Sequence, residues 1–315
     1  MITKMRLPNG IINSNSQHLI GAGELFTTGT VFYVDSVTGS NGNKGTDPKL
    51  PFATVDAAIS ACTANKGDTV VVMPGHAETV TATSIALDVA GVTIVGYGNG
   101  LKRPAFTFGA AAATITVTGA NCGWSGCHFI GNFLDVASAF TLGAAKDFSL
   151  INNTFVDNSS ALGFLSIVVT NATANAADGL TVVGNEWTGL DVSPNAFVSI
   201  LEANKRITIT DNYVFSAATN DVGHFITLAA FNILSAKIQR NVLIVTGSTG
   251  ATVGIFLTGS GTASLGVVSD NFISSLDTTT ELIATAGTGL DFFRNEYTGV
   301  ADKSGYILPA IDSAA

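Results

Sequence analysis

The chain has 315 residues, a formal net charge of −9 at pH 7 and 12% charged residues, about half the usual share for a soluble protein. The acidic balance and the lack of any basic run argue against a nucleic-acid partner. Mean hydropathy is +0.41, yet no apolar segment approaches the roughly 18 residues that a membrane span requires, so the low charge predicts a surface partly buried against copies of this chain or other proteins.

Residues 1–30 carry Pro8, Gly10, Gly21 and Gly23 among polar clusters and show no stable hydrophobic period. A terminal segment of this kind is usually frayed unless something binds it. We therefore predict an N-terminal arm that is held by a neighbouring subunit. The first residues, MITKMRLPNGIINSNSQ, lack the apolar core of a secretory signal, so we expect a protein that is made in a cytoplasm and not exported from it.

The next stretch predicts a strand, a Gly- and Asn-rich loop and an amphipathic helix near residues 53–65. Thr54 suits the helix N-cap. Val55, Ala58, Ile59 and Cys62 fall on one helical stripe. We expect this helix to cover the open strand edges at the start of the fold.

The loop before this helix carries oxygen donors of the type that binds calcium, namely Asp35, Asn41, Asn43 and Asp47. It lacks the bidentate Glu that ends an EF-hand loop. We expect a hydrogen-bonded turn network here, with a calcium site as the alternative.

A pattern typified by FSLINNTF, residues 148–155, recurs at intervals of 22 to 32 residues. Relative to Asn153, large apolar residues stand five and three places before and two places after. The reference positions are Gly75, Tyr97, Cys127, Asn153, Asn185, Asn212, Asn241, Asn271 and Asn295. This pattern is typical of a repeat protein whose coils differ in length.

Apolar residues two places apart indicate a strand with one buried face. One strand and a corner cannot bury that face alone, so successive repeats must stack and share a core. We expect each asparagine to adopt the left-handed conformation of a tight corner and to bond to its neighbours in a ladder. The sequence thus predicts an all-β fold over residues 31–298, a right-handed parallel β-helix of about nine coils.

Two other folds share parts of this pattern. A leucine-rich repeat adds an apolar residue eight places before the Asn, where this chain has Ala145, Ala177, Asn204, Ile233, Ala263 and Gly287. A β-sandwich predicts alternation but no asparagine ladder. The β-helix therefore fits the pattern best.

The positions just before the later reference asparagines alternate in charge, with Asp211, Arg240, Asp270 and Arg294. If these residues stack one strand spacing apart, they form a ladder of ion pairs, and each pair stabilises the fold by roughly 0.2–1 kcal/mol. A catalytic interpretation takes Asp211 and Asp270, roughly 9–10 Å apart, as the acid and base of an inverting glycosidase. Because Arg240 between them would lower both pKa values, whereas a general acid needs a raised pKa, we favour the ion-pair ladder.

The other candidates for chemistry are His18, His76, His128, His224, Cys62, Cys122 and Cys127. No histidine has a visible nucleophile partner, so we expect hydrogen-bonded structural roles. Three cysteines do not make a disulfide framework, and Cys122 and Cys127 fit packing positions. Trp124 and Trp187 fall on inward positions and are expected in the core. No cofactor site or metal site other than the calcium alternative is predicted.

The repeat stops after residue 298. Residues 299–315 contain one apolar cluster, from Tyr306 to Ile311, interrupted by Pro309. This tail either covers the last coil or reaches a neighbouring molecule.

The run YVDSVTGSNGNKGTDPKLPFATVDAAI resembles the N-terminal module of pectate-lyase-like right-handed β-helix proteins. The matching residues are Asp35, Gly39, Gly45, Thr46, Pro48, Pro51, Phe52, Thr54, Ala57 and Ile59. With the coils, the resemblance covers about residues 31–300. It implies the fold and not the function, because this architecture serves polysaccharide lyases, hydrolases and phage virion proteins. The next segment, GDTVVVMPGHAETV, resembles β-helix proteins encoded among phage structural genes.

For a lyase the resemblance would imply acidic residues that bind calcium on adjacent coils, with an Arg or Lys base. For a polygalacturonase-like hydrolase it would imply an Asp pair, a Gly-His-Gly and an Arg-Ile-Lys. The sequence contains none of these motifs.

We therefore expect a non-enzymatic phage virion structural protein, a homotrimer that decorates or cements the capsid. Its expected partners are itself and, through the arm, the major capsid protein or another virion protein. Its expected location is the head surface of the virion, after assembly in the bacterial host cytoplasm. The alternatives are a phage tailspike or fibre that binds or cleaves host surface glycans, and a free polysaccharide lyase, which the missing signal peptide and acidic cluster disfavour.

Overall fold

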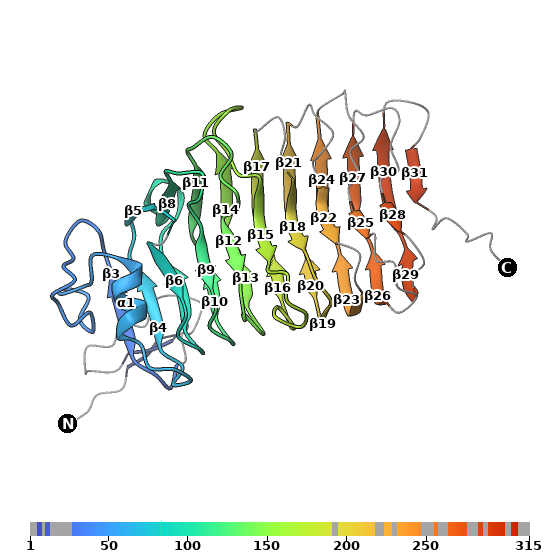
Figure 1. Ribbon diagram of the computed structural model, residues 1–315. Helices are drawn as coiled ribbons and strands as arrows, with labels where there is room; N and C mark the ends of the chain where they lie inside the picture. The colour runs from blue at the N-terminus through green and yellow to red at the C-terminus, as the bar shows by residue number, and fades with distance from the viewer. Residues whose placement is uncertain are drawn as a thin grey trace.

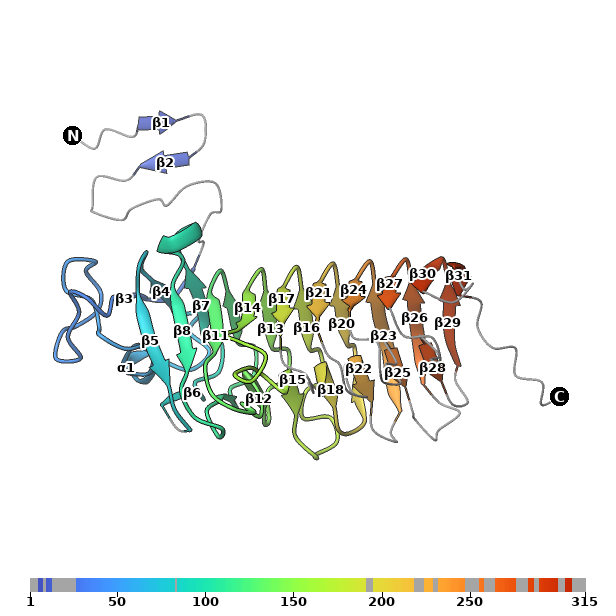
Figure 2. The same ribbon diagram turned by 90° about the horizontal axis from the view of Figure 1, so that it is seen from above.

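The chain folds as an all-β parallel β-solenoid, and its described residues include one short α-helix (Figure 1). The computed structural model describes residues 5–7, 10–12, 27–82, 84–190, 195–217, 224–228, 232–246, 255–257, 264–275, 283–285, 289–299 and 304–307. Within these ranges, the chain passes through three sheets in turn and then returns to the first, one strand further along the column. Figure 2 shows the same succession of strands from a second direction.

The first sheet has eleven strands. They are β3 (Val31–Val34), β4 (Thr69–Val72), β7 (Thr93–Gly96), β10 (Gly123–Ser125), β13 (Ser149–Ile151), β16 (Thr181–Val183), β20 (Thr208–Thr210), β23 (Ile233–Gln239), β26 (Leu265–Ser269) and β29 (Gly289–Phe293), with β19 (Asn204–Lys205) also paired to β23.

The second sheet has ten strands. They are β5 (Ala77–Val80), β8 (Ala105–Phe108), β11 (His128–Gly131), β14 (Thr154–Asp157), β17 (Glu186–Gly189), β21 (Tyr213–Ser216), β24 (Val242–Val245), β27 (Phe272–Ser275), β30 (Asn295–Gly299) and β31 (Ser304–Ile307). The third sheet has eight strands. They are β6 (Ile85–Leu87), β9 (Ile115–Val117), β12 (Phe140–Leu142), β15 (Ser166–Thr170), β18 (Ala196–Ile200), β22 (His224–Leu228), β25 (Ile255–Leu257) and β28 (Ile283–Thr285).

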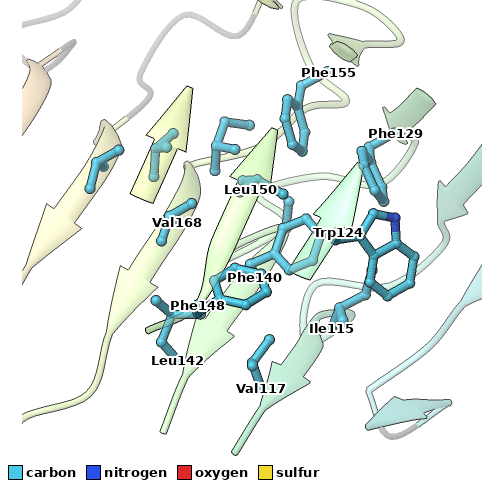
Figure 3. Close-up of a cluster of buried hydrophobic side chains, with 14 of the residues drawn as sticks. Ile115, Val117, Trp124, Phe129, Phe140, Leu142, Phe148, Leu150, Phe155 and Val168 are labelled. Atoms are coloured by element: carbon cyan, nitrogen blue, oxygen red, sulfur yellow. The ribbon is translucent and has the colours of Figure 1, made fainter. Parts of the chain in front are cut away.

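The core runs along the inside of the column and contains the apolar residues of the repeat. Phe129 and Phe155 stack with ring centroids 4.8 Å apart, and Phe140 packs edge-on against Phe129 at 5.3 Å (Figure 3). Trp124 and Trp187 are buried, as predicted. Each wholly buried large apolar side chain contributes about 1.5–3 kcal/mol, so continuous stacking provides the stability that no single coil has.

The predicted asparagine ladder is confirmed. Asn153, Asn185, Asn212, Asn241, Asn271 and Asn295 are all buried. Each Oδ1 accepts hydrogen bonds from the preceding coil: Asn241 Oδ1, for example, accepts from the backbone N–H and Nδ2 of Asn212 at 3.1 and 3.0 Å. Each Nδ2 also reaches a backbone carbonyl, as Asn212 Nδ2 does with Val182 O at 2.9 Å. At Cys127 the backbone N–H still donates to Asn153 Oδ1 at 3.0 Å, but the ladder ends there because a cysteine side chain has no amide to continue it.

The left-handed corner lies one residue earlier than we predicted. The residue before each ladder asparagine has positive φ, for example Asn152 at 54° and Arg240 at 54°, whereas no ladder asparagine does. The reason is that the ladder asparagine must turn its amide inward to bond to the next coil, while the preceding residue makes the turn and directs its side chain outward. We call this line the corner row: Gly126, Asn152, Gly184, Asp211, Arg240, Asp270 and Arg294.

The repeat is interrupted in the first coils. Tyr97 was assigned as a reference position, but the next strand, β8, begins only at Ala105. The 3-10 helix η1 (Gly100–Lys102) occupies the interval. The corner there is enlarged, and the ladder does not extend to Tyr97 or Gly75.

The helix α1 (Val55–Ala61) covers the start of the column. Thr54 is its N-cap, as predicted, and its side chain accepts the N–H of Ala57. The carboxylate of Asp56 accepts the N–H of Ala86 on β6 at 3.1 Å. This bond fixes the helix over the first edge of the third sheet, where unpaired strand groups need cover.

The predicted helix range of 53–65 was too long. The N–H of Cys62 returns to Ile59 O at 2.9 Å, and the N–H of Thr63 donates to the carboxylate of Asp68 at 2.7 Å. Buried Asp68 also accepts the N–H of Thr30 at 2.5 Å. The helix ends early because Asp68 holds the following backbone against the start of β3.

The two ends of the chain contribute short antiparallel pairs. Strands β1 (Met5–Leu7) and β2 (Gly10–Ile12) of the arm pair with each other. Near the C-terminus, β31 pairs antiparallel with β30, so this part of the tail adds a final strand to the second sheet. Residues 308–315, including Pro309, lie outside the described residues.

Replacing Asn212 by Ala should destabilise the column. The change removes the acceptor of the buried backbone N–H of Asn185 and the side-chain donor to Val182 O. Leaving such a buried group unpaired costs about 1–3 kcal/mol. Urea unfolding followed by circular dichroism measures the difference in free energy of unfolding. The matched control is Asn158→Ala, because exposed Asn158 makes one side-chain bond, to Asn132 Oδ1 at 2.8 Å. Equal midpoints for the two variants would contradict a stabilising ladder.

Candidate functional site

The corner row carries the charged residues that the sequence singled out. The guanidinium of Arg240 donates two hydrogen bonds to the carboxylate of Asp211, from Nε to Oδ1 at 2.7 Å and from Nη2 to Oδ2 at 2.6 Å. Arg294 donates two hydrogen bonds to Asp270 in the same way, from Nε to Oδ1 at 2.7 Å and from Nη2 to Oδ2 at 3.0 Å. The last four residues of the row therefore form two fork-shaped ion pairs, each between adjacent coils.

These pairs bear directly on the catalytic interpretation. The hydrogen bonds from Arg240 lower the pKa of Asp211, and those from Arg294 lower the pKa of Asp270. Both carboxyl groups therefore stay ionised at neutral pH, whereas a general acid must hold a proton. The paired arginines also occupy the carboxylate oxygens that a water or sugar would need to reach. The arrangement fits a structural role.

A third ion pair was missed in the sequence. Arg206 Nη1 lies 3.1 Å from Asp147 Oδ1. Both residues stand just before a strand of the first sheet, at the opposite end of the strands from the corner row, and Arg206 is two coils further along the column than Asp147. Gly179 stands between them in the stack, and a side chain there would clash with the Asp147 carboxylate. The sequence does contain a signal for this pair, because Asp147, Gly179 and Arg206 each stand two places before a strand of the first sheet and therefore stack in one line.

The calcium candidates are engaged in the turns of their own loop. Asp35 accepts the N–H of Val37 at 3.0 Å and the hydroxyl of Thr38 at 2.5 Å. Asn41 Oδ1 accepts the N–H of Ala53 at 2.9 Å. Further bonds join Asn43 Nδ2 to Pro51 O at 2.8 Å and the N–H of Lys49 to Asp47 Oδ1 at 2.9 Å.

These bonds form the turn network that we expected as the default for the loop. Although burial opposes the shift, the bonds from Thr38 and Val37 keep the pKa of Asp35 below its usual value. Among the described residues, no group of three or more His, Cys, Asp or Glu side chains is placed to hold a metal ion.

Of the two histidines whose side chains the structure describes, His76 is held by more hydrogen bonds. Its Nδ1 accepts the N–H of Ser36 at 3.0 Å, so Nε2 carries the proton and donates to Glu78 Oε2 at 3.1 Å. The same Glu78 oxygen accepts the N–H of Val55 at the start of α1, at 3.0 Å. His76 and Glu78 thus join the N-terminal loop and the helix to the column.

His128 lies on β11 with Nδ1 at 2.7 Å from the hydroxyl of Thr154. Burial, together with the charge of Arg103, lowers its pKa, so the ring is neutral at pH 7. The side chains of His18 and His224 lie outside the described residues.

The outer face of the second sheet presents a feature that the sequence reasoning missed. Five large apolar residues on three adjacent strands point outward there: Tyr213, Phe215, Val242, Ile244 and Phe272. We call this set the apolar face. Tyr213 is 41% exposed, and the other four are partly exposed. The sequence repeat could have indicated this face, since all five residues stand one or three places after a ladder asparagine.

Comparison with known proteins finds matches among the solved structures. No protein family matches the chain, and no curated protein matches it. Seven chains among the solved structures match. A rhamnogalacturonan lyase matches with a TM-score of 0.42 and 14% identity, over 89% of this chain and 90% of that one.

Two structures of a GH136 lacto-N-biosidase from Eubacterium ramulus, native and selenomethionine derivative, match with a TM-score of 0.31. Their identities are 10% and 9%, over 86% of this chain and 68% of theirs.

Replacing Arg240 by Gln should lower stability at neutral pH but not in acid. The pKa of Asp211 in the folded protein lies below its usual 3.8. The pair therefore stabilises the fold above that pH, and its contribution is lost as the pH falls through the folded-state pKa. We expect the urea midpoints of the variant and the native protein to differ at pH 7 and to converge as the pH falls through the folded-state pKa of Asp211.

Lys44→Gln is the control, because it removes a positive charge from an exposed loop residue. A midpoint difference for Arg240→Gln that persists unchanged in acid would contradict the pairing with Asp211.

The three cysteines should be unreactive in the folded protein. Burial raises the pKa of both Cys62 and Cys127 to about 12 and also raises that of Cys122. Since the thiolate is the reactive form, Ellman's reagent at pH 8 should label none of them within minutes. All three should react after unfolding in guanidinium. Rapid labelling of one thiol in the native state would show that its surroundings are more open than described.

Proposed function

We propose that this chain is a non-enzymatic structural protein of a phage particle, a homotrimer that decorates or cements the head shell. The observation that carries the proposal is the apolar face, which lies beside a corner row whose carboxylates are already neutralised by arginine. A surface of this kind suits association with protein, because exposed contiguous apolar patches mark interaction sites. The low charge of the chain and its resemblance to phage β-helix proteins support the same assignment.

The proposed assembly has two kinds of contact. The chain binds copies of itself through the column, and it binds the major capsid protein or another virion protein through the N-terminal arm. A modest contact that recurs around a shell becomes strong through multivalency. We further propose that the solenoid is right-handed with about nine coils, that it needs no cofactor, and that it is located on the virion head.

A tailspike or fibre that binds or cleaves host glycans is the second candidate. It is favoured by the exposed rings of Tyr213 and Phe293, each 41% exposed, since such rings can stack on sugars. Incubation with host surface polysaccharide, followed by analysis of the products, tests it. Release of oligosaccharides by the native protein, retained in an Asp211→Asn, Asp270→Asn double variant, would place the chemistry elsewhere on the column.

Deleting residues 1–25 should abolish binding to particles that lack the protein, while the column stays folded. Co-sedimentation measures binding, and circular dichroism measures folding. The matched control replaces the same residues by a Gly/Ser segment of equal length, which keeps the chain length and removes the arm sequence. Full binding of the shortened protein would contradict the role of the arm.

A further inference from the structure

The apolar face is bounded by charge at both ends of its column. Glu186 on β17 precedes it and Glu296 on β30 follows it, both outward and exposed. Between them, the outward positions of β21, β24 and β27 hold no charged residue. The strands are consecutive and in register, with Tyr213 beside Val242 and Val242 beside Phe272. The face is therefore one continuous uncharged patch.

The charges beside this patch cancel locally. The corner row borders the same three strands, since Asp211, Arg240 and Asp270 each stand two places before one of them. Asp211 is neutralised by Arg240, and Asp270 by Arg294. A chain with a net charge of −9 repels its own copies. At this patch, however, two copies can approach without bringing unpaired like charges together.

The geometry of the patch also indicates what kind of surface can pack against it. Its side chains stand in two straight rows, with successive members one strand spacing apart, about 4.8 Å. A partner that fills every gap between these rows needs a flat surface with the same repeat. A second copy of this chain has that repeat along its whole column, whereas the sheet of a typical globular protein has it over only about 4–6 strands.

The residue types fit the centre of such a contact. Tyr and Phe are enriched in the buried middle of protein interfaces, where charged residues are depleted. Three strands alone are smaller than the roughly 800 Å² per partner of a stable interface. Val156 and Thr188, which continue the row of Phe215 and Ile244, would provide further area, with Glu186 of the other row at the edge of the contact.

We infer that the apolar face, Tyr213, Phe215, Val242, Ile244 and Phe272, is buried against a second copy of this chain. The inference rests on the proposed homotrimer and names the surface that holds it together. The corner row lies at the rim of this contact, where its internal pairs prevent repulsion between subunits.

The test compares charged substitutions on two outer faces of the same column. Ile244→Lys and Phe215→Glu lie on the apolar face, and Ile151→Lys and Val183→Glu are matched controls on the outer face of the first sheet, where both residues are also outward and partly exposed. Light scattering coupled to gel filtration, over a hundredfold range of concentration, gives the mass of each protein. Circular dichroism and thermal melting confirm that each protein is folded.

We expect the native protein and both controls to be oligomers, and the two apolar-face variants to need at least tenfold higher concentration to associate. If a charged variant fails to fold, the variant Phe215→Thr, Ile244→Thr takes its place, because Thr188 already occupies an outward position on this sheet. That variant should also weaken association.

The other outcomes separate the possible errors. A native oligomer that all variants retain would overturn this inference and leave the homotrimer standing. A native monomer that still pellets with particles would overturn both the inference and the trimer, but not decoration. If the apolar-face variants remain oligomers but no longer pellet with particles, the face binds the shell and not a second copy, and the inference is wrong.

Discussion

The buried asparagine ladder is the interaction on which the regular part of the solenoid depends. From Asn185 onward, each Oδ1 accepts a backbone and a side-chain donor from the preceding coil, so neighbouring coils can pair in one register only. A slip of one residue would turn every inward side chain outward and leave the amides unpaired in the core. Because the ladder fixes this register from Asn153 to Asn295, residues at equal distance from it form straight rows along the column.

Two of these rows give the surface its chemical character. The residue before the ladder asparagine takes the left-handed conformation and directs its side chain outward, and its neighbour one coil away lies beside it. Opposite charges at that position become fork-shaped pairs, as with Asp211 and Arg240. The residues one and three places after the asparagine form the outer face of the second sheet. There the chain places apolar residues over three successive strands, so the same register produces a neutral rim and an apolar face.

The N-terminal end is organised by polar contacts of a different kind. Glu78 binds both His76 and the first turn of α1, and Asp68 binds the chain on both sides of that helix. Side-chain carboxylates are used here because the first coil has no preceding coil to satisfy its backbone donors. The column therefore has a polar, closed beginning and a long regular body, and the body carries the surface on which we base the proposed assembly.

The sequence by itself determined the parts of the fold that depend on local spacing. The ladder asparagines, the inward Trp124 and Trp187, the N-cap at Thr54 and the alternation of charge in the corner row follow from fixed distances along the chain, which every coil repeats. Only the tertiary structure decided the rest. The strands of the third sheet lie at variable distances from the ladder, so no fixed spacing marks them. The end of α1 depends on Asp68, and the pairing of Asp147 with Arg206 depends on the gap left by Gly179 in the coil between them. The apolar face also required the fold, because its residues become one surface only when three coils separated by long loops stack in register.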